Sequence, residues 1–288
     1  MVPFSLELTM KSPYLPYTNE LQDGLWMWGH ETGVYDGPGN CYNIPVSEPI
    51  GMAHACGYMG VPNVCSVRWE TCGKAHLWQY RNMKRFGWVI GHNPETYARL
   101  YPFAESLVAD YPNLTAFELD DFFDNKPDEL QPDPKGGETL VSPATLTLQE
   151  LDALKKRMAT LPHPVELRIV LYARQLKPTI VPALDYADTI LFWTWNGCDI
   201  AKLPENFHQY RELVPSKPTL LGIYMWDFGD RKPLDLGFMK EQLSIALEWW
   251  KNREINGLIF HCTPLVNKDL PAVEYCREWI AQHAKETR

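Results

Sequence analysis

The sequence predicts a single α/β domain, residues 1–288, in which eight parallel strands alternate with helices and close into a (β/α)₈ barrel. Three observations predict this fold. Short apolar runs of strand character alternate with amphipathic helical runs along almost the whole chain, which is typical of parallel α/β proteins. The strand-like runs number eight, as such a barrel needs. The length of 288 residues is common for one barrel, and no segment resembles a linker between two domains.

The expected strands are apolar runs bounded by turn residues or helix signals. They cover residues 24–30, 63–70, 86–91, 114–120, 165–172, 189–195, 219–226 and 257–261. An open, doubly wound sheet is the alternative arrangement. Such a sheet usually has a glycine-rich phosphate-binding turn after its first strand, but the glycines between Gly33 and Gly39 do not fit the G-x-G-x-x-G spacing. We therefore expect them to form a loop built from turns, and we favour the closed TIM barrel.

Several helices between these strands have recognisable ends. Asn93 and Pro94 are an N-cap followed by proline at the first helical position. Thr147 and Glu150 have the spacing of a capping box, and the apolar residues after them share one helix face. A last helix over residues 272–285 is expected to pack on the first strand and close the ring.

Three segments depart from the regular pattern. Residues 71–85, where the second helix should lie, show no clean helical period, and Pro102 interrupts the third helix. Residues 124–142, after the fourth strand, form a long loop that is polar and rich in proline and glycine. Active sites of these barrels are built from the loops that follow the strands, so this long loop is a candidate lid or substrate wall. A plain surface loop is the alternative.

Composition limits the partners and the compartment. The formal charge of −9 and the absence of a lysine- or arginine-rich run argue against nucleic acid or an anionic membrane as the main partner. No apolar run approaches the roughly 18 residues that span a bilayer. Residues 1–7 lack the basic and apolar regions of a secretory signal, and the seven cysteines show no C-x-x-C pair. We expect a cytoplasmic protein without a cofactor, although a secreted protein whose signal peptide had been removed would look the same.

Side chains alternate between the two faces of a strand, and this rule assigns charged residues to the barrel interior. In the second strand the apolar Cys65, Val67 and Trp69 suit the helix side. Asp121 is expected to point away from the interior and to anchor the loop that follows. The residues expected to face the interior are Ser66, Arg68, Glu70, Ala116, Glu118, Asp120, Arg168, Val170, Tyr172 and Arg174. Such interiors are normally apolar, so these charges favour a site, and arginines that only neutralise buried acids are the structural alternative.

Aromatic and polar residues gather at the ends of the remaining strands. An aromatic face can stack on the C–H face of a sugar ring, while carboxylates and amides bind its hydroxyl groups, and small-molecule pockets commonly combine both. The sequence therefore predicts a pocket for a small-molecule carbohydrate. The expected substrate-binding residues are His30, Arg68, Tyr172, Arg174, Trp193, Trp195, Asn196, Tyr224, Trp226, Asp227 and His261, with Trp28 and His92 at two further strand ends.

With these features the chain resembles the TIM-barrel glycoside hydrolases. The resemblance rests on the expected barrel, on acids at the ends of the second and fourth strands, and on tryptophan-rich strand ends. The stretch Glu118-Leu119-Asp120 is similar to part of the D-x-D-x-E strand end of the chitinase-like family, with a different order of acids. The Asn-Glu pair that ends the fourth strand of many other barrel glycosidases is absent. The resemblance implies cleavage of a glycosidic bond.

That cleavage needs one carboxylic acid to protonate the leaving oxygen and a second carboxylate as nucleophile or general base. We expect Asp120 to be the proton donor and Glu70, across the barrel, to be its partner. Glu118 would support them from the layer below, with Asp227 in reserve as the second carboxylate.

Two alternatives belong to other functional classes. A metal-dependent sugar isomerase or epimerase would use Glu70, Glu118, Asp120 and His261 as ligands of a divalent cation. No H-x-H or H-E-x-x-H spacing supports it, nearby arginines disfavour a cation, and we expect no metal site. A non-catalytic carbohydrate-binding barrel would use the same aromatic residues, with the acids only accepting hydrogen bonds from hydroxyl groups.

Overall fold

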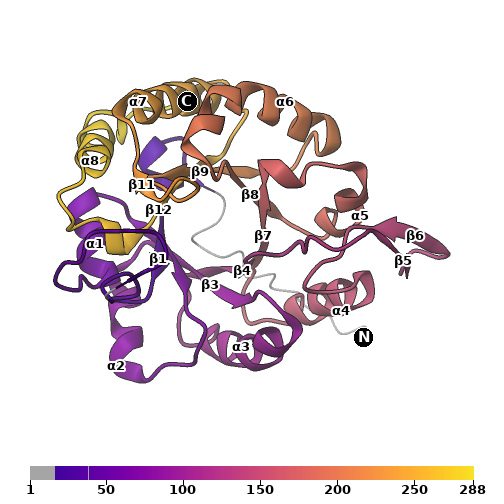
Figure 1. Cartoon of the computed structure of the whole chain (residues 1–288). Coiled ribbons are helices and arrows are strands. Elements are labelled where there is room, and N and C mark those ends of the chain that lie inside the picture. The colour runs from indigo at the N-terminus through magenta and orange to yellow at the C-terminus, as the bar shows by residue number, and fades with distance from the viewer. Residues whose placement is uncertain (1–16, 38) are drawn as a thin grey trace, which may run out of the picture.

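The computed structural model of the protein describes residues 17–37 and 39–288, and it is a barrel of parallel strands inside a ring of helices (Figure 1). The prediction made for residues 1–7 lies outside the described residues. Within the described part of the chain, no helix is both long enough and apolar enough to cross a membrane.

Eight parallel strands form one closed sheet, in which β1 pairs with both β2 and β12. The closure confirms the predicted TIM barrel and excludes the open sheet. Several strands end earlier than predicted, so residues assigned to strand ends lie in the loops that follow. The barrel strands are β1 (Leu25–His30), β2 (Asn63–Val67), β3 (Arg85–Gly91), β4 (Leu114–Leu119), β7 (Glu166–Tyr172), β8 (Thr189–Trp193), β9 (Thr219–Tyr224) and β12 (Gly257–His261).

The surrounding helices are α1 (Met52–Met59), α2 (Lys74–Leu77), α3 (Pro94–Leu107), α4 (Leu148–Met158), α5 (Val181–Leu184), α6 (Leu203–Leu213), α7 (Leu236–Lys251) and α8 (Pro271–His283). Short 3₁₀ turns lie at Leu21–Gly24, Trp78–Asn82, Ala173–Gln175, Pro178–Ile180, Gly197–Lys202 and Thr263–Leu265. In Figure 1 the last helix, α8, stands beside α1 and completes the ring.

The predicted helix starts are confirmed, since Asn93 caps α3 and Thr147 caps α4, each in a capping box. The irregular second segment contains only the single turn α2 and a 3₁₀ turn. The expectation that Pro102 interrupts the third helix is wrong. Pro102 lies inside α3 on its exposed side, where water can bind the carbonyl group that the proline leaves free.

The long segment after β4 folds into an antiparallel hairpin of β5 (Glu129–Pro132) and β6 (Glu138–Val141). The hairpin projects from the edge of the barrel beside α4 and α5, away from the ring of strands (Figure 1). Gln131 Oε1 accepts a hydrogen bond from the Leu148 amide at 3.2 Å, and the Ser142 amide donates to the Thr179 carbonyl at 2.8 Å. These bonds fasten the hairpin to the helical layer, so its position is not that of the lid considered from the sequence. A second, two-residue hairpin, β10 (Trp226–Asp227) and β11 (Lys232–Pro233), follows β9.

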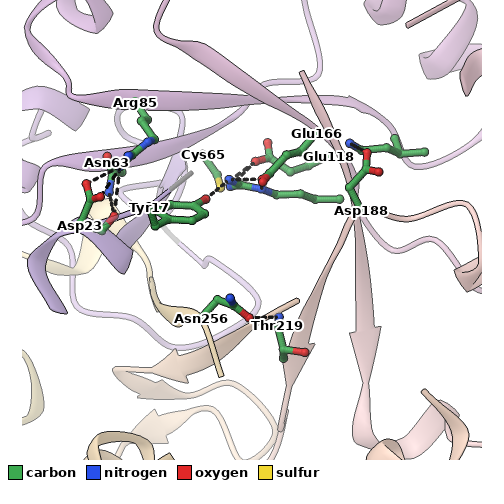
Figure 2. Close-up of polar contacts among 12 residues, drawn as sticks. Tyr17, Asp23, Asn63, Cys65, Arg85, Glu118, Glu166, Asp188, Thr219 and Asn256 are labelled. Carbon is green, nitrogen blue, oxygen red and sulfur yellow. Dashed lines mark hydrogen bonds and ion pairs between the residues drawn. The ribbon is translucent and has the colours of Figure 1, made fainter. Parts of the chain in front are cut away.

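Polar contacts close the barrel at the N-terminal ends of its strands (Figure 2). Asp23, just before β1, accepts a hydrogen bond from Arg85 Nη2 on β3 at 3.1 Å. Burial would raise the pKa of Asp23, but its hydrogen bonds with Arg85 and Lys84 outweigh this and hold the pKa well below its usual range. Asn63 on β2 donates to the Asp23 carbonyl at 3.0 Å and to the Leu25 carbonyl at 2.8 Å. These contacts occupy the N-terminal end of the barrel and hold the strands together there.

Candidate active site

A pocket of about 260 Å³ opens at the C-terminal ends of the barrel strands. Active sites of TIM barrels lie at this end, and the volume is near the lower limit for pockets that bind small molecules. Most of its wall is aromatic. The lining residues are Trp28, His30, Tyr35, Tyr42, Trp69, Asp120, Asp121, Tyr172, Arg174, Trp193, Trp195, Tyr224, Phe228 and His261.

Two acids that follow β4, Asp120 and Asp121, lie together in this pocket. The inward position of Asp120 is confirmed, whereas the expectation that Asp121 points away is wrong. The strand ends at Leu119, and Asp121 adopts a left-handed backbone conformation with φ 43°. Strand alternation therefore no longer applies at Asp121, and the turn brings both carboxyl groups to one cavity.

Asp120 and Asp121 have different environments. Asp120 is 6% exposed, and its Oδ1 accepts a hydrogen bond from the Asp121 amide at 2.9 Å. Burial, and then the charge of Asp121, raise the pKa of Asp120 well above its usual value. Asp121 is exposed and accepts a hydrogen bond from the Tyr172 hydroxyl at 3.0 Å. Two neighbouring acids with unlike environments are what acid–base chemistry requires.

Glu118 lies in the layer below Asp120 and is fully buried, as the alternation rule predicts. Its Oε1 accepts a hydrogen bond from the Cys65 thiol at 3.0 Å and is 3.4 Å from Arg168 Nη1. Burial raises the pKa of Glu118 to about 7, although Arg168 opposes the shift. Gly87 on β3 makes room for this carboxyl group, because a Cβ atom there would overlap it.

Arg168 is also inside the barrel, as predicted, and its guanidinium is surrounded by partners. It donates to the Tyr17 hydroxyl at 2.7 Å and to Glu166 Oε2 at 2.9 Å, and it lies 4.0 Å from the centroid of the Trp26 ring. In Figure 2 Tyr17, Glu166 and Glu118 lie together in the barrel interior. For Arg168 the structural alternative therefore holds, because it neutralises buried acids and does not reach the pocket.

The side-chain directions predicted for β2 are wrong. Cys65 points inward to Glu118, whereas Ser66 points outward, where its hydroxyl is 2.6 Å from that of Tyr80. A hydroxyl partner in the helical layer lets a polar residue face that side. Trp69, which was assigned to the outside, lines the pocket.

Arg68 and Glu70 also leave the predicted interior, because β2 ends at Val67. Arg68 is 3.5 Å from Glu31, and Glu70 is exposed. Neither residue lines the pocket, so Glu70 is not placed as a partner of Asp120 and Arg68 is not placed to bind a substrate there.

Seven of the expected substrate-binding residues do line the pocket: His30, Tyr172, Arg174, Trp193, Trp195, Tyr224 and His261. Gly222 on β9 leaves space for the Trp193 indole, since a Cβ atom at that position would overlap the ring. His30 and His261 share a hydrogen bond between their Nε2 atoms at 3.3 Å. Burial lowers the pKa of His30 to about 4 and, together with His30, lowers that of His261, so both rings are neutral at pH 7.

Asn196, Trp226 and Asp227 do not line the pocket but fasten the loops around it. Asn196 donates to Asp199 at 2.7 Å, and Asp227 accepts from the Asp230 amide at 3.0 Å. The Trp226 indole donates to the Tyr42 carbonyl at 3.1 Å and so holds a loop that carries part of the pocket wall. Asp227 is therefore not placed as the reserve carboxylate.

Sequence reasoning missed several pocket residues. Strand alternation assigned Asp121 and Trp69 to the outer face of the barrel, and Trp28 was expected at a strand end without a role. Tyr35, Tyr42 and Phe228 lie in loops, where no periodicity predicts direction. Their aromatic character in loops that follow strands was the one available signal.

The metal site of the alternative hypothesis is not assembled. Glu70 is at the surface and Glu118 is paired with Arg168, so neither joins Asp120 and His261. Within the part of the chain that the structure describes, His30, His261 and Cys262 form the group whose potential ligand atoms lie within 4.8 Å of one another. The two imidazole rings of this group already bind each other.

No protein-family model and no curated protein matches the chain. Solved structures do share its fold. A protein assigned as an α-L-fucosidase from Bacteroides thetaiotaomicron is 10% identical, with a TM-score of 0.58 over 93% of this chain and 97% of that chain. A family 18 chitinase from Crocus vernus is 8% identical, with a TM-score of 0.52 over 90% and 98%. A β-glucuronidase from Bifidobacterium dentium is 11% identical, with a TM-score of 0.55 over 92% and 47%.

The chain has the fold of TIM-barrel glycoside hydrolases. The predicted resemblance is therefore confirmed at the level of fold. One such fold hosts many activities, so the substrate and the catalytic residues depend on the side chains of the pocket.

Proposed function

We propose that the protein is a glycoside hydrolase with Asp120 as the proton donor and Asp121 as the second carboxylate. One observation carries the proposal: Asp120 is a buried acid without a cationic partner among the described residues, in an aromatic pocket at the C-terminal end of the barrel. The fold shared with a chitinase and a β-glucuronidase supports the same reaction class. Asp121 replaces Glu70, the partner expected from the sequence.

The two acids divide the chemistry. The raised pKa of Asp120 keeps its proton on at pH values where an ordinary aspartate has lost it, so Asp120 can protonate the leaving oxygen. Asp121, oriented by the Tyr172 hydroxyl, provides the carboxylate that activates water or attacks the anomeric carbon. Activity should fall as pH rises through the pKa of Asp120, because the proton donor is then lost. The aromatic wall would stack on the sugar ring, and this chemistry needs no cofactor.

Hydrolysis of a panel of aryl glycosides tests the proposal. The variants are Asp120→Asn and Asp121→Asn, with Glu70→Gln as a control that neutralises an exposed acid outside the pocket. Each aspartate variant should lower kcat about 10²–10⁴-fold, while Glu70→Gln stays within about twofold of wild type. The loss in Asp120→Asn should be larger for phenyl than for nitrophenyl glycosides, because a poor leaving group depends more on protonation.

Other outcomes would reject the assignment. Wild-type rates in both aspartate variants, on a glycoside that the enzyme cleaves, would exclude these residues as catalysts. Sugar binding seen as a change in tryptophan fluorescence, with no turnover across the panel, would indicate a non-catalytic carbohydrate-binding barrel. Turnover that is lost with EDTA and restored by a divalent ion would favour the metal-dependent alternative.

A further inference from the structure

The aromatic pocket continues into a second hollow. A cavity of about 480 Å³ shares Asp121 and Arg174 with the pocket, and a third cavity of about 210 Å³ continues it towards the base of the β5–β6 hairpin. We call these two cavities the polar groove, which is lined mainly by residues 121–126 and 174–177. A substrate larger than the pocket can therefore extend into the groove past Asp121 and Arg174.

Arg174 lies at the junction of pocket and groove, and no described residue forms an ion pair with it. Its Cζ atom is 4.2 Å from the centroid of the Tyr172 ring and 5.6 Å from that of Trp195. Among the described residues it makes no hydrogen bond and has no carboxylate within 4 Å, and its side chain is exposed. The other groove cations differ, since Lys126 pairs with Asp124 at 2.7 Å and Lys177 with Asp128 at 2.6 Å.

Tyr172, which supports Arg174, is held in place. Its hydroxyl donates to Asp121 at 3.0 Å, its amide donates to Gln175 Oε1 at 2.9 Å, and its side chain is buried. A guanidinium stacked on a fixed ring loses little freedom when it binds, and its planar set of donors matches a carboxylate or a sulfate. In a chain of net charge −9, an arginine that is unpaired in the described part of the chain suits an anionic ligand at this junction.

We propose that Arg174 binds a carboxylate or sulfate group on the leaving-group side of the substrate, in the polar groove. The substrate class is thus an anionic oligosaccharide or glycoside whose terminal ring occupies the aromatic pocket. This rests on the proposed function, because it takes Asp120 as the point of bond cleavage. The terminal ring lies on one side of Asp120 and Asp121, and the anionic unit lies on the other side, next to Arg174.

Matched leaving groups test the inference. For a sugar that the enzyme cleaves, kcat/KM is measured on its 4-carboxyphenyl, 4-sulfophenyl and 4-carbamoylphenyl glycosides, of which the last is an uncharged analogue of the first. We expect the wild type to prefer one or both anionic substrates over the carbamoyl compound by about tenfold or more, as for a charge-assisted bidentate contact. The two anionic compounds distinguish a carboxylate from a sulfate.

Two arginine variants locate the effect. Arg174→Gln should reduce the anionic-to-neutral ratio to about one, and Arg174→Lys should retain only part of it because a lysine lacks the planar fork. Arg253→Gln, at the opposite end of the barrel, should keep the wild-type ratio. A wild-type ratio near one, or a ratio unchanged in Arg174→Gln, would overturn the inference.

Binding separates this inference from the proposed function. The same compounds are titrated against Asp120→Asn and against the Asp120→Asn/Arg174→Gln double variant, with tryptophan fluorescence as the readout. Anion preference that depends on Arg174, without turnover by wild type, would support the binding role and reject the hydrolase. Turnover without anion preference would support the hydrolase and reject the binding role of Arg174.

Discussion

Glu118 and Asp120 lie two residues apart on one face of the chain at the end of β4, and both are buried, but their surroundings differ. Glu118 is paired with Arg168 and with the Cys65 thiol. Asp120 has no cationic partner among the described residues and faces a cavity. Burial alone therefore does not identify a candidate catalytic acid in this barrel. A candidate catalytic acid is identified by two further features, which are access to a cavity and no cationic partner among the described residues.

The same contrast divides the whole barrel interior. Below the pocket, charges are matched within the fold, with Asp23 bound to Arg85 and Arg168 bound to Glu118 and Glu166. In the pocket, Asp120 and Arg174 have no such partners among the described residues, and aromatic rings line the space between them. The charges below the pocket stabilise the fold, and those in the pocket are available to a ligand.

The largest expected effect separates activity from stability at Asp120. Asp120→Asn should lower kcat about 10²–10⁴-fold. At pH 8 its free energy of unfolding should equal or exceed that of wild type, because an acid with a raised pKa destabilises the folded state once the unfolded chain ionises. Glycoside kinetics and urea unfolding measure the two quantities. If Asp120→Asn lost activity only because it unfolds, Asp120 would be a structural acid like Glu118.

The next effect concerns the paired acid. Arg168→Met should reduce the free energy of unfolding by about 3–5 kcal/mol at pH 8, because it leaves Glu118 and Glu166 without their buried cation. Adding Glu118→Gln should restore part of the loss, since the buried charge is then absent. Urea unfolding of the single and double variants measures this, with Arg253→Gln as a surface control. A cost below about 1 kcal/mol for Arg168→Met would mean that the pair is not a structural unit.

Sequence periodicity predicted side-chain directions correctly in β4 and β7, where strands persist, and failed where strands end. Within β4 and β7, alternation correctly placed Glu118 and Arg168 inside the barrel. Beyond Leu119 and Val67 the backbone turns, so the rule misdirected Asp121 and assigned Glu70 to an interior that it never reaches. Strand ends carry the site, and they are the positions where a period of two stops applying.

The error in β2 has a different physical origin. Both faces of a barrel strand are buried, so apolar character does not distinguish the interior from the helical layer. The Ser66 hydroxyl forms a hydrogen bond with the Tyr80 hydroxyl, and the Cys65 thiol donates one to Glu118. Both contacts join separate segments of the chain. The eight-strand count and the two helix N-caps depend on local sequence alone, which is why the fold could be predicted more fully than the pocket.

The pH dependence of stability sharpens the account of Glu118. Its pKa is raised from 4.5 to about 7, so between these pH values the unfolded chain releases a proton that the folded protein keeps. The protonated Glu118 therefore contributes about 3 kcal/mol to the free energy of unfolding. This contribution is fully present below about pH 4.5 and is lost as pH rises to about 7. Urea unfolding from pH 4.5 to 8 should show a decline in wild type that is smaller by this amount in Glu118→Gln. Parallel profiles would mean that Glu118 has an ordinary pKa.

The smallest effect tests the space that holds Glu118. Gly87→Ala places a methyl group where the Glu118 carboxyl lies, and we expect a loss of about 1–3 kcal/mol from overpacking. Gly57→Ala is the matched control, because a methyl group on that exposed position of α1 meets nothing within 4 Å and should stabilise the helix by about 0.5–1 kcal/mol. If Glu118 is the obstacle, Gly87→Ala should cost much less in a Glu118→Ala background. An unchanged cost there would show that the strain lies in the backbone of β3 rather than in the paired acid.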